Sequence, residues 1–165
     1  MMSKDKFHIR RLDVSDRDWV KSIIEKYWGS ELVVTKGVVH DASKLPGYIA
    51  ILNDIRAGLI TYRIEGDECE IVTMNSLKEN IGVGSALIEA VKNKAINSYC
   101  RRIWLITTND NLHALGFYQK RGFVLKAVYP DAVKISRRLK EEIPIFGNDN
   151  IPVRDEIELE MILKE

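Results

Sequence analysis

The chain has 165 residues, 45% of them hydrophobic and 30% charged, with a formal net charge of +1 at pH 7. This length and composition are typical of one globular domain with a substantial core. The nearly neutral charge gives no support for binding an anionic membrane or nucleic acid, and the sequence has no nucleic-acid-binding motif.

The first residues, MMSKDKFHIRRL, are basic but lack the apolar segment of a secretory signal. No uninterrupted apolar run approaches the roughly 18 residues of a membrane span. The two cysteines, Cys69 and Cys100, have no metal-ligand spacing. We therefore expect a cytoplasmic protein with reduced, buried thiols and no metal site.

The first half of the sequence predicts a strand and a helix, followed by three strands in quick succession. Short turns separate these three strands, which favours antiparallel neighbours. Residues 29–44 show no clear pattern. The expected elements are a strand at 7–12, an amphipathic helix capped by Ser15 or Asp16 and carrying Trp19, Ile23, Ile24 and Tyr27, and strands at 48–52, 59–64 and 68–75.

The second half alternates helices with strands. Residues 102–108 form a nearly continuous apolar run, which is typical of a strand covered on both faces. Helical spacing precedes this run and returns after it. The expected elements are a helix from about Gly82 to Ala95, a strand at 102–108, a helix through Leu112, Leu115 and Tyr118 that Gly122 ends, a strand at 123–129, a basic helix at 131–140 and a strand at 156–163.

Strands followed by alternating helices and strands indicate an α/β fold, with a mixed sheet and helices on both of its faces. No internal repeat, low-complexity tract or linker divides the sequence. We expect a single domain over residues 1–165.

Residues 77–85, LKENIGVGS, join an expected strand to a helix that begins near Gly82. Backbone N–H groups at a helix start carry partial positive charge, and glycine lets a pyrophosphate come close to them. On these residues alone, tight turning or close packing explains Gly82 and Gly84 more simply. The segment lacks the lysine of a Walker A loop, and Leu87 stands at the third glycine of the dinucleotide fingerprint.

The stretch NLHALGFYQKRGF, at 111–123, follows an apolar strand, and GVGSALIEAV, at 82–91, precedes it by about thirty residues. Together they make the chain resemble the GCN5-related N-acetyltransferase (GNAT) family, in an uncharacterised bacterial-type subgroup. The resemblance implies a mostly antiparallel sheet with a splayed central strand pair. It also implies direct transfer of acetyl from acetyl-CoA to a primary amine.

The resemblance assigns the CoA pyrophosphate to backbone amides at the start of this helix. Glu79 stands where the family usually has Arg or Gln, so we expect its carboxylate to point away. Lys78 is then a candidate replacement cation. The residues implied in pyrophosphate binding are Ile81, Gly82, Val83, Gly84 and Ser85.

Acetyl transfer requires an amine that loses a proton, a stabilised oxyanion and a proton donor for the departing thiolate. By resemblance, the Met74 backbone meets the acetyl carbonyl, Asn111 contacts the cofactor, and Tyr118 binds near the CoA sulfur and acts as general acid. By spacing alone, Tyr118 fits the core stripe of its helix and Asn111 fits a helix cap.

The general base is less clearly marked. Glu70, on the strand that leads to Met74, is a candidate for direct or water-mediated proton removal, and a solvent-facing carboxylate is the alternative. His40 and His113 are further candidates. Removal of the amine proton by a chain of water molecules, without a dedicated base, is a further alternative.

The resemblance places the acceptor near residues 27–44 and 129–155. Tyr27 and Trp28 suit an aromatic wall or simple helix packing, whereas charged side chains there suit either acceptor binding or solvation. These charged residues are Asp41, Arg137, Arg138 and Arg154. A small-molecule amine is the first expectation, ahead of a protein N-terminus or lysine. The alternative is an acyl-CoA sensor without turnover, and a homodimer formed by the late strands is a further expectation.

Overall fold

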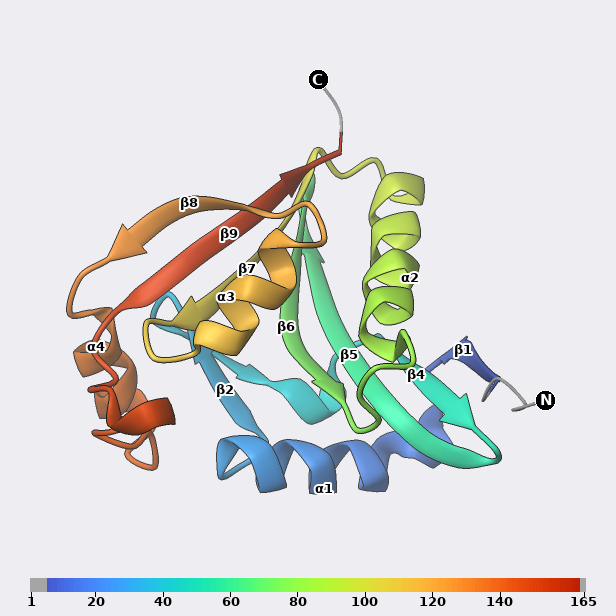
Figure 1. Ribbon diagram of the computed structural model, residues 1–165, viewed down its shortest axis with the longest axis horizontal. Coiled ribbons are helices and arrows are strands. Elements are labelled where there is room, and N and C mark those ends of the chain that lie inside the picture. The colour runs from blue at the N-terminus through green and yellow to red at the C-terminus, as the bar shows by residue number, and fades with distance from the viewer. Residues whose placement is uncertain (1–5, 164–165) are drawn as a thin grey trace.

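The structure is a computed structural model that describes residues 6–163 (Figure 1). A seven-stranded sheet has the order β1-β4-β5-β6-β7-β9-β8, and β2 and β3 form a separate hairpin. The strands are β1 (Phe7–Arg11), β2 (Leu32–Thr35), β3 (Val38–Asp41), β4 (Gly47–Leu52), β5 (Ile55–Glu65), β6 (Glu68–Ser76), β7 (Arg102–Thr108), β8 (Val124–Tyr129) and β9 (Glu156–Ile162). The helices are α1 (Arg17–Trp28), α2 (Val83–Asn97), α3 (Leu112–Gln119) and α4 (Ala132–Leu139).

The sheet pairs are antiparallel except for the parallel pair of β6 and β7. Helices α2 and α3 contribute to the larger core on one face, where Leu87 and Val91 meet sheet residues such as Ile103. Helix α1 covers the other face with Val20 and Ile24. The predicted mixed, mostly antiparallel α/β fold is therefore confirmed.

The central strands β6 and β7 diverge. Their pairing runs from Glu68 opposite Arg102 to Ile71 opposite Leu105. Strand β6 nevertheless continues to Ser76 and β7 to Thr108, in different directions (Figure 1). The expected splay of this pair is present. Beyond Ile71 and Leu105 the facing edges of the two strands no longer pair with each other, so their backbone N–H and C=O groups face the opening.

Within residues 29–44, which the sequence pattern left unassigned, β2 and β3 form a hairpin over residues 32–41, and a 3-10 turn follows at Ala42–Lys44. Thr35 lies opposite Val38, so Lys36 and Gly37 make the turn, with φ of 49° and 74°. Positive φ at both central residues is the geometry of a type I′ turn, which is usually signalled by Asn-Gly. Lys36-Gly37 is a weaker signal, and the hairpin was missed for that reason.

The start of α1 differs from the expected cap. Asp16 occupies the N-cap position, but its side chain makes no capping bond there. Its buried carboxylate instead accepts from Arg10 at 2.7 Å and is paired with Arg56 at 3.2 Å. The predicted N-cap position is therefore correct for Asp16, but its carboxylate joins α1 to β1 and β5 instead of bonding the helix start.

Both cysteines are free and buried, as expected. Strand β8 lies at a sheet edge with Val124, Leu125 and Val128 more than half exposed. The homodimer at this end of the sheet stays a prediction. Over residues 6–163, no helix is both long and apolar enough to cross a membrane.

Candidate active site

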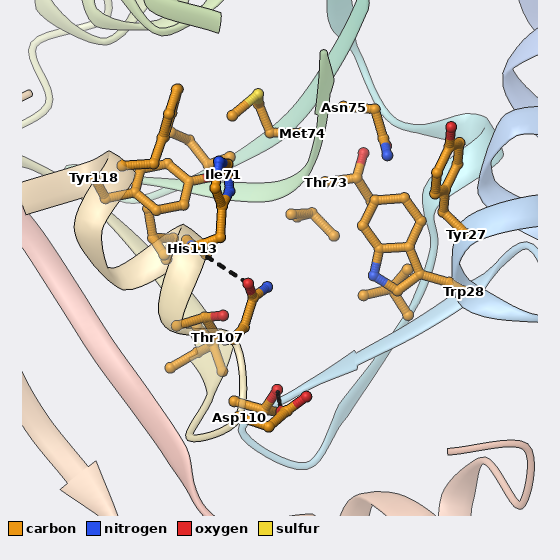
Figure 2. Close-up of a pocket in the computed structure, with 18 of the residues that line it drawn as sticks. Tyr27, Trp28, Ile71, Thr73, Met74, Asn75, Thr107, Asp110, His113 and Tyr118 are labelled. Carbon is orange, nitrogen blue, oxygen red and sulfur yellow. Dashed lines mark hydrogen bonds between the residues drawn. The ribbon is translucent and has the colours of Figure 1, made fainter. Parts of the chain in front are cut away.

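The splay of β6 and β7 opens into a cavity of about 1050 Å³. Residues 71–76 of β6 and 105–108 of β7 line it, together with α3, the start of α2, the end of α1, β2 and residues of α4 and β9. Figure 2 shows Tyr118, Met74 and His113 at one side and Tyr27 with Trp28 at the other. After the roles that the resemblance predicts for them, we call these the cofactor side and the acceptor side.

On the cofactor side, Gly82 is the N-cap of α2 with φ of 89°. The first backbone bond of the helix runs from the Ala86 N–H to the Gly82 carbonyl, so the N–H groups of residues 83–85 have no intrahelical acceptor. Gly82, Val83 and Gly84 line the cavity. This is the anion-binding geometry that the sequence predicts.

Gly84 is required by packing between the two motifs. A Cβ built there would lie 2.7 Å from the Phe117 ring, so α3 presses directly on the first turn of α2. Ile81 and Ser85 are outside the lining residues: Ile81 packs on the core, and the Ser85 hydroxyl accepts from Arg121.

Arg121 supplies a cation beside the α2 start, a role that sequence reasoning missed. Its Nε donates to Ser85 Oγ at 2.9 Å, and its guanidinium carbon lies 3.5 Å from the Phe117 ring centroid. Arg121 lines the cavity with Lys78 and Glu79. Arg121 lies in the turn after α3, where its side chain also donates to the Phe117 carbonyl at 2.9 Å. The four-residue spacing from Phe117 was the signal in the sequence, because it brings the two side chains close at a helix end.

Tyr118, Met74 and Asn111 all line the cavity. Tyr118 is 7% exposed, and burial raises the pKa of its phenol well above the ordinary value, so it stays protonated at neutral pH. The Asn111 side chain accepts from the Ala114 N–H at 3.1 Å, so it caps α3 as well as facing the cavity.

Glu70 lies in a buried polar cluster on the α1 face and is not among the cavity-lining residues. Its carboxylate accepts from the Thr35 hydroxyl at 2.6 Å and is paired with Arg63 at 3.1 Å. The Thr35 oxygen is also 2.8 Å from Nε2 of His40. Burial raises the pKa of Glu70 and lowers that of His40. Thr35 does line the cavity, so it stands between Glu70 and that space.

The acceptor side is built from distant segments. The rings of Tyr27 and Trp28, at the end of α1, pack edge to face with their centroids 6.4 Å apart. The ammonium of buried Lys140 donates to the carbonyls of Trp28 and Leu32 and so ties the chain after α4 to the end of α1. Desolvation by burial lowers the pKa of Lys140.

Glu156, at the start of β9, also lines the acceptor side and is 3% exposed. Ile157 and Leu159 of the same strand pack in the α2 core, so alternation directs Glu156 to the opposite face. Its carboxylate accepts from the Ser136 hydroxyl at 2.8 Å and the Lys36 backbone N–H at 3.0 Å. Sequence reasoning missed this residue.

The charged acceptor candidates lie elsewhere: Asp41, Arg137, Arg138 and Arg154 do not line the cavity. Asp41 caps a short turn through Ser43, and Arg137 donates to three loop carbonyls. His113 lines the cavity and stacks on Phe117. Among residues 6–163, no group of three or more His, Cys, Asp or Glu side chains is arranged to hold a metal.

The profile of the Acetyltransferase (GNAT) family matches residues 16–123, so the chain belongs to this family of acetyltransferases. The chain is 43% identical over 151 residues to the uncharacterized protein YxbD of Bacillus subtilis (strain 168), covering 90% of this chain and 92% of YxbD. It is 46% identical over 134 residues to the uncharacterized protein YdhI of the same strain, covering 80% and 83%.

A GNAT family acetyltransferase from Elizabethkingia anophelis, solved with acetyl-CoA bound, has the same fold with a TM-score of 0.69. It is 22% identical, and the match covers 97% of this chain and 100% of the other. The family resemblance inferred from residues 82–91 and 111–123 is confirmed, and acetyl-CoA is the acetyl donor of this family.

Proposed function

We propose that the protein is an N-acetyltransferase that moves acetyl directly from acetyl-CoA to the primary amine of a small molecule. The observation that carries this proposal is the cavity through the splay, which has Tyr118 and Trp28 at opposite sides (Figure 2) and is also lined by the α2 start, Thr35 and Glu156. Donor and acceptor would therefore meet between β6 and β7 in one ternary complex.

On the donor side, the N–H groups of residues 83–85 and the Arg121 guanidinium would hold the CoA pyrophosphate. The Met74 backbone would receive the acetyl carbonyl as it becomes an oxyanion. Tyr118 would donate its phenolic proton to the departing sulfur. Its raised pKa supports this assignment, because the proton is present over the whole neutral range.

On the acceptor side, Glu70 would take the amine proton through the Thr35 hydroxyl. Thr35 reaches the cavity and donates to Glu70 at 2.6 Å. The raised pKa of Glu70 makes its carboxylate a stronger base than an exposed glutamate.

Cavity size favours a small acceptor over a folded protein. Ligand sites are usually about 300–1,000 Å³, and the 1050 Å³ here would have to hold the acetyl end of the cofactor as well. Trp28, Lys140 and Val153 line the acceptor side, so the space left suits a compact amine.

The test is release of CoA thiol from acetyl-CoA in the presence of polyamines, amino acids, aminoglycosides or short peptides. Amine-dependent release with a small amine, and mass-spectrometric detection of its N-acetyl product, is the expected result. Calorimetric binding of acetyl-CoA without release across the whole panel would instead favour an acyl-CoA sensor. Release only with peptides would move the acceptor to a protein N-terminus or lysine.

A further inference from the structure

Buried carboxylates in this fold are generally paired with cations, as the cost of burying a charge requires. Asp16 pairs with Arg10, and Glu70 with Arg63. On β9, Glu158 and Glu160 both pair with Arg102 at 2.8 Å. The exceptions among the buried carboxylates of residues 6–163 are Asp110 and Glu156, which make no ion pair in this part of the chain.

Asp110 has a structural reason to be buried without a cation. Its Oδ2 accepts from both the backbone N–H and the side-chain amide of Asn148 at 2.9 Å, and its Oδ1 accepts from Thr108. It thereby fixes the loop after residue 147 to the end of β7. These bonds account for the burial of Asp110.

Glu156 is less fully bonded. Oε1 accepts from Ser136 and Oε2 from the Lys36 backbone N–H. An ionised carboxylate has about four acceptor positions, so Glu156 retains capacity for further donors. Because it also lines the cavity, a ligand can supply both those donors and the missing positive charge.

A second observation also calls for a hydrogen-bond donor at this cavity. Asn75 lines it, and the Oδ1 atom of Asn75 is buried without a hydrogen-bond partner in residues 6–163. Asn75 pairs with Leu59 of the α1-side core, so it lies on the same sheet face as Glu156. Figure 2 shows Asn75 between Met74 and Tyr27. Buried polar atoms nearly always have a hydrogen-bond partner, so an unpartnered oxygen at a cavity wall calls for a donor from water or from a ligand.

The lining charges are distributed in the same sense. Lys78, Lys120 and Arg121 line the cofactor side, with Glu79 beside them, whereas Glu156 and Glu142 line the acceptor side. Asp110 also lines the cavity, but both of its oxygens are already bonded, to Thr108 and Asn148. The Lys140 ammonium there is already engaged by backbone carbonyls. The acceptor side therefore offers negative charge without an available cation of its own.

We infer that Glu156 binds the acceptor's protonated amine, so that the enzyme selects small cationic primary amines; this rests on the proposed function. The position suits proton removal, because Glu156 holds the N–H of Lys36 and Thr35 is the preceding residue. The ammonium loses one proton through Thr35 to Glu70. The amine nitrogen then bonds to the acetyl carbon, the carbon–sulfur bond breaks, and the sulfur takes the proton of Tyr118. The nitrogen gives up its second proton, which returns through solvent to the Tyr118 oxygen, so that a neutral amide, the CoA thiol and the phenol result.

The test compares the wild type with Glu156→Gln, which keeps the shape and removes the charge. The amines are putrescine, spermidine, kanamycin and alanine amide, at saturating acetyl-CoA. For the best of them, we expect Glu156→Gln to raise the amine KM at least about tenfold, with the KM for acetyl-CoA within about twofold. The hydroxyl analogue of that amine, used as a competitive inhibitor, should bind both proteins with similar affinity.

Two further variants separate charge recognition from structure. Glu160→Gln removes a carboxylate on the same strand and face that is ion-paired and outside the cavity lining, and it should leave the amine KM unchanged. Ser136→Ala removes the hydroxyl bonded to Glu156 but keeps the charge, so it should raise the amine KM less than Glu156→Gln does.

An unchanged amine KM in Glu156→Gln, with an active wild type, overturns this inference alone. The inference is also overturned if Ser136→Ala raises the amine KM as much as Glu156→Gln does. It is likewise overturned if Glu156→Gln weakens binding of the hydroxyl analogue as much as binding of the amine. In either case Glu156 would only stabilise the structure of the acceptor side. Absence of amine-dependent release by the wild type overturns the proposed function, and this inference with it.

Discussion

The two sides of the cavity are assembled in different ways. The cofactor side comes mainly from two short segments, residues 82–85 and 111–121, each of which carries its functional groups on one helix or helix start. The acceptor side combines the end of α1, the β2–β3 hairpin, α4 and the start of β9. The first is encoded locally, whereas the second exists only once distant segments have packed.

From this difference we expect chemistry and specificity to be separable. The α2 start and Tyr118, to which the proposal assigns pyrophosphate binding and proton donation, lie on helices that pack on the main core. The acceptor side depends on contacts such as those of Lys140 with Trp28 and of Glu156 with Lys36. Substitutions on the acceptor side should therefore change which amine is used without changing the KM for acetyl-CoA.

The largest expected effect is that of Tyr118→Phe. Loss of the proton donor to sulfur should lower kcat by about 10²–10³, the range of general-acid catalysis, with the KM for acetyl-CoA changed less than about threefold. Tyr62→Phe is the matched control, since Tyr62 is a buried phenol of the same core whose pKa burial raises to about 12 and which does not line the cavity. Steady-state kinetics that show unchanged turnover in Tyr118→Phe at every pH would remove Tyr118 from the mechanism.

The next effect tests the link from the acceptor side to Glu70. Glu70→Gln and Thr35→Val should each lower kcat/KM by roughly 10–10². Because the pKa of Glu70 is raised, the wild-type rate should fall on acidification at a pH above the ordinary glutamate value of 4.5. Below that pH the carboxyl is protonated and cannot accept the amine proton. A pH–rate profile with the same acid limb in Glu70→Gln would assign the proton to another acceptor.

Gly84→Ala should weaken the cofactor side alone. The added methyl group would lie 2.7 Å from the Phe117 ring, so the α2 start and α3 must move apart. We expect a loss of stability of about 1–3 kcal/mol and roughly tenfold weaker acetyl-CoA binding by calorimetry. Phe117→Leu in the same chain should restore part of the stability. Additive losses in the double variant would show that this contact is not the cause.

The smallest expected effect on catalysis is that of Lys140→Met. Its ammonium satisfies the carbonyls of Trp28 and Leu32, so its loss should cost about 1–3 kcal/mol of stability. The amine KM should rise about threefold as the aromatic wall loosens. An equal rise in the KM for acetyl-CoA would contradict the independence of the two sides. Lys134→Met, on exposed α4 surface, is the control.

Much of the fold and of the cofactor side could be predicted from sequence. Gly82, Gly84, Asn111 and Tyr118 line the cavity as the resemblance implied, because short-range spacing on helices fixes where such groups point. The splay of β6 and β7 follows from the same resemblance. Their catalytic and binding roles stay predictions.

The acceptor side could not be predicted in the same way. The alternation of Glu156, Glu158 and Glu160 with apolar residues predicted a strand with a polar face. That this face is buried depends on the β2–β3 hairpin, whose Lys36 reaches Glu156 and Glu158 across about 120 residues of sequence. Without recognition of the hairpin, nothing in the local pattern separates a solvated glutamate from one that faces a cavity.

The most direct test of the account varies acetyl-CoA and an accepted amine together and records initial rates of thiol release. Direct transfer in a ternary complex predicts lines that intersect in a double-reciprocal plot, because both ligands must occupy the splay before either product leaves. Parallel lines would indicate an acetylated enzyme intermediate and contradict direct transfer between the two sides. Absence of amine-dependent release would contradict the enzyme assignment itself.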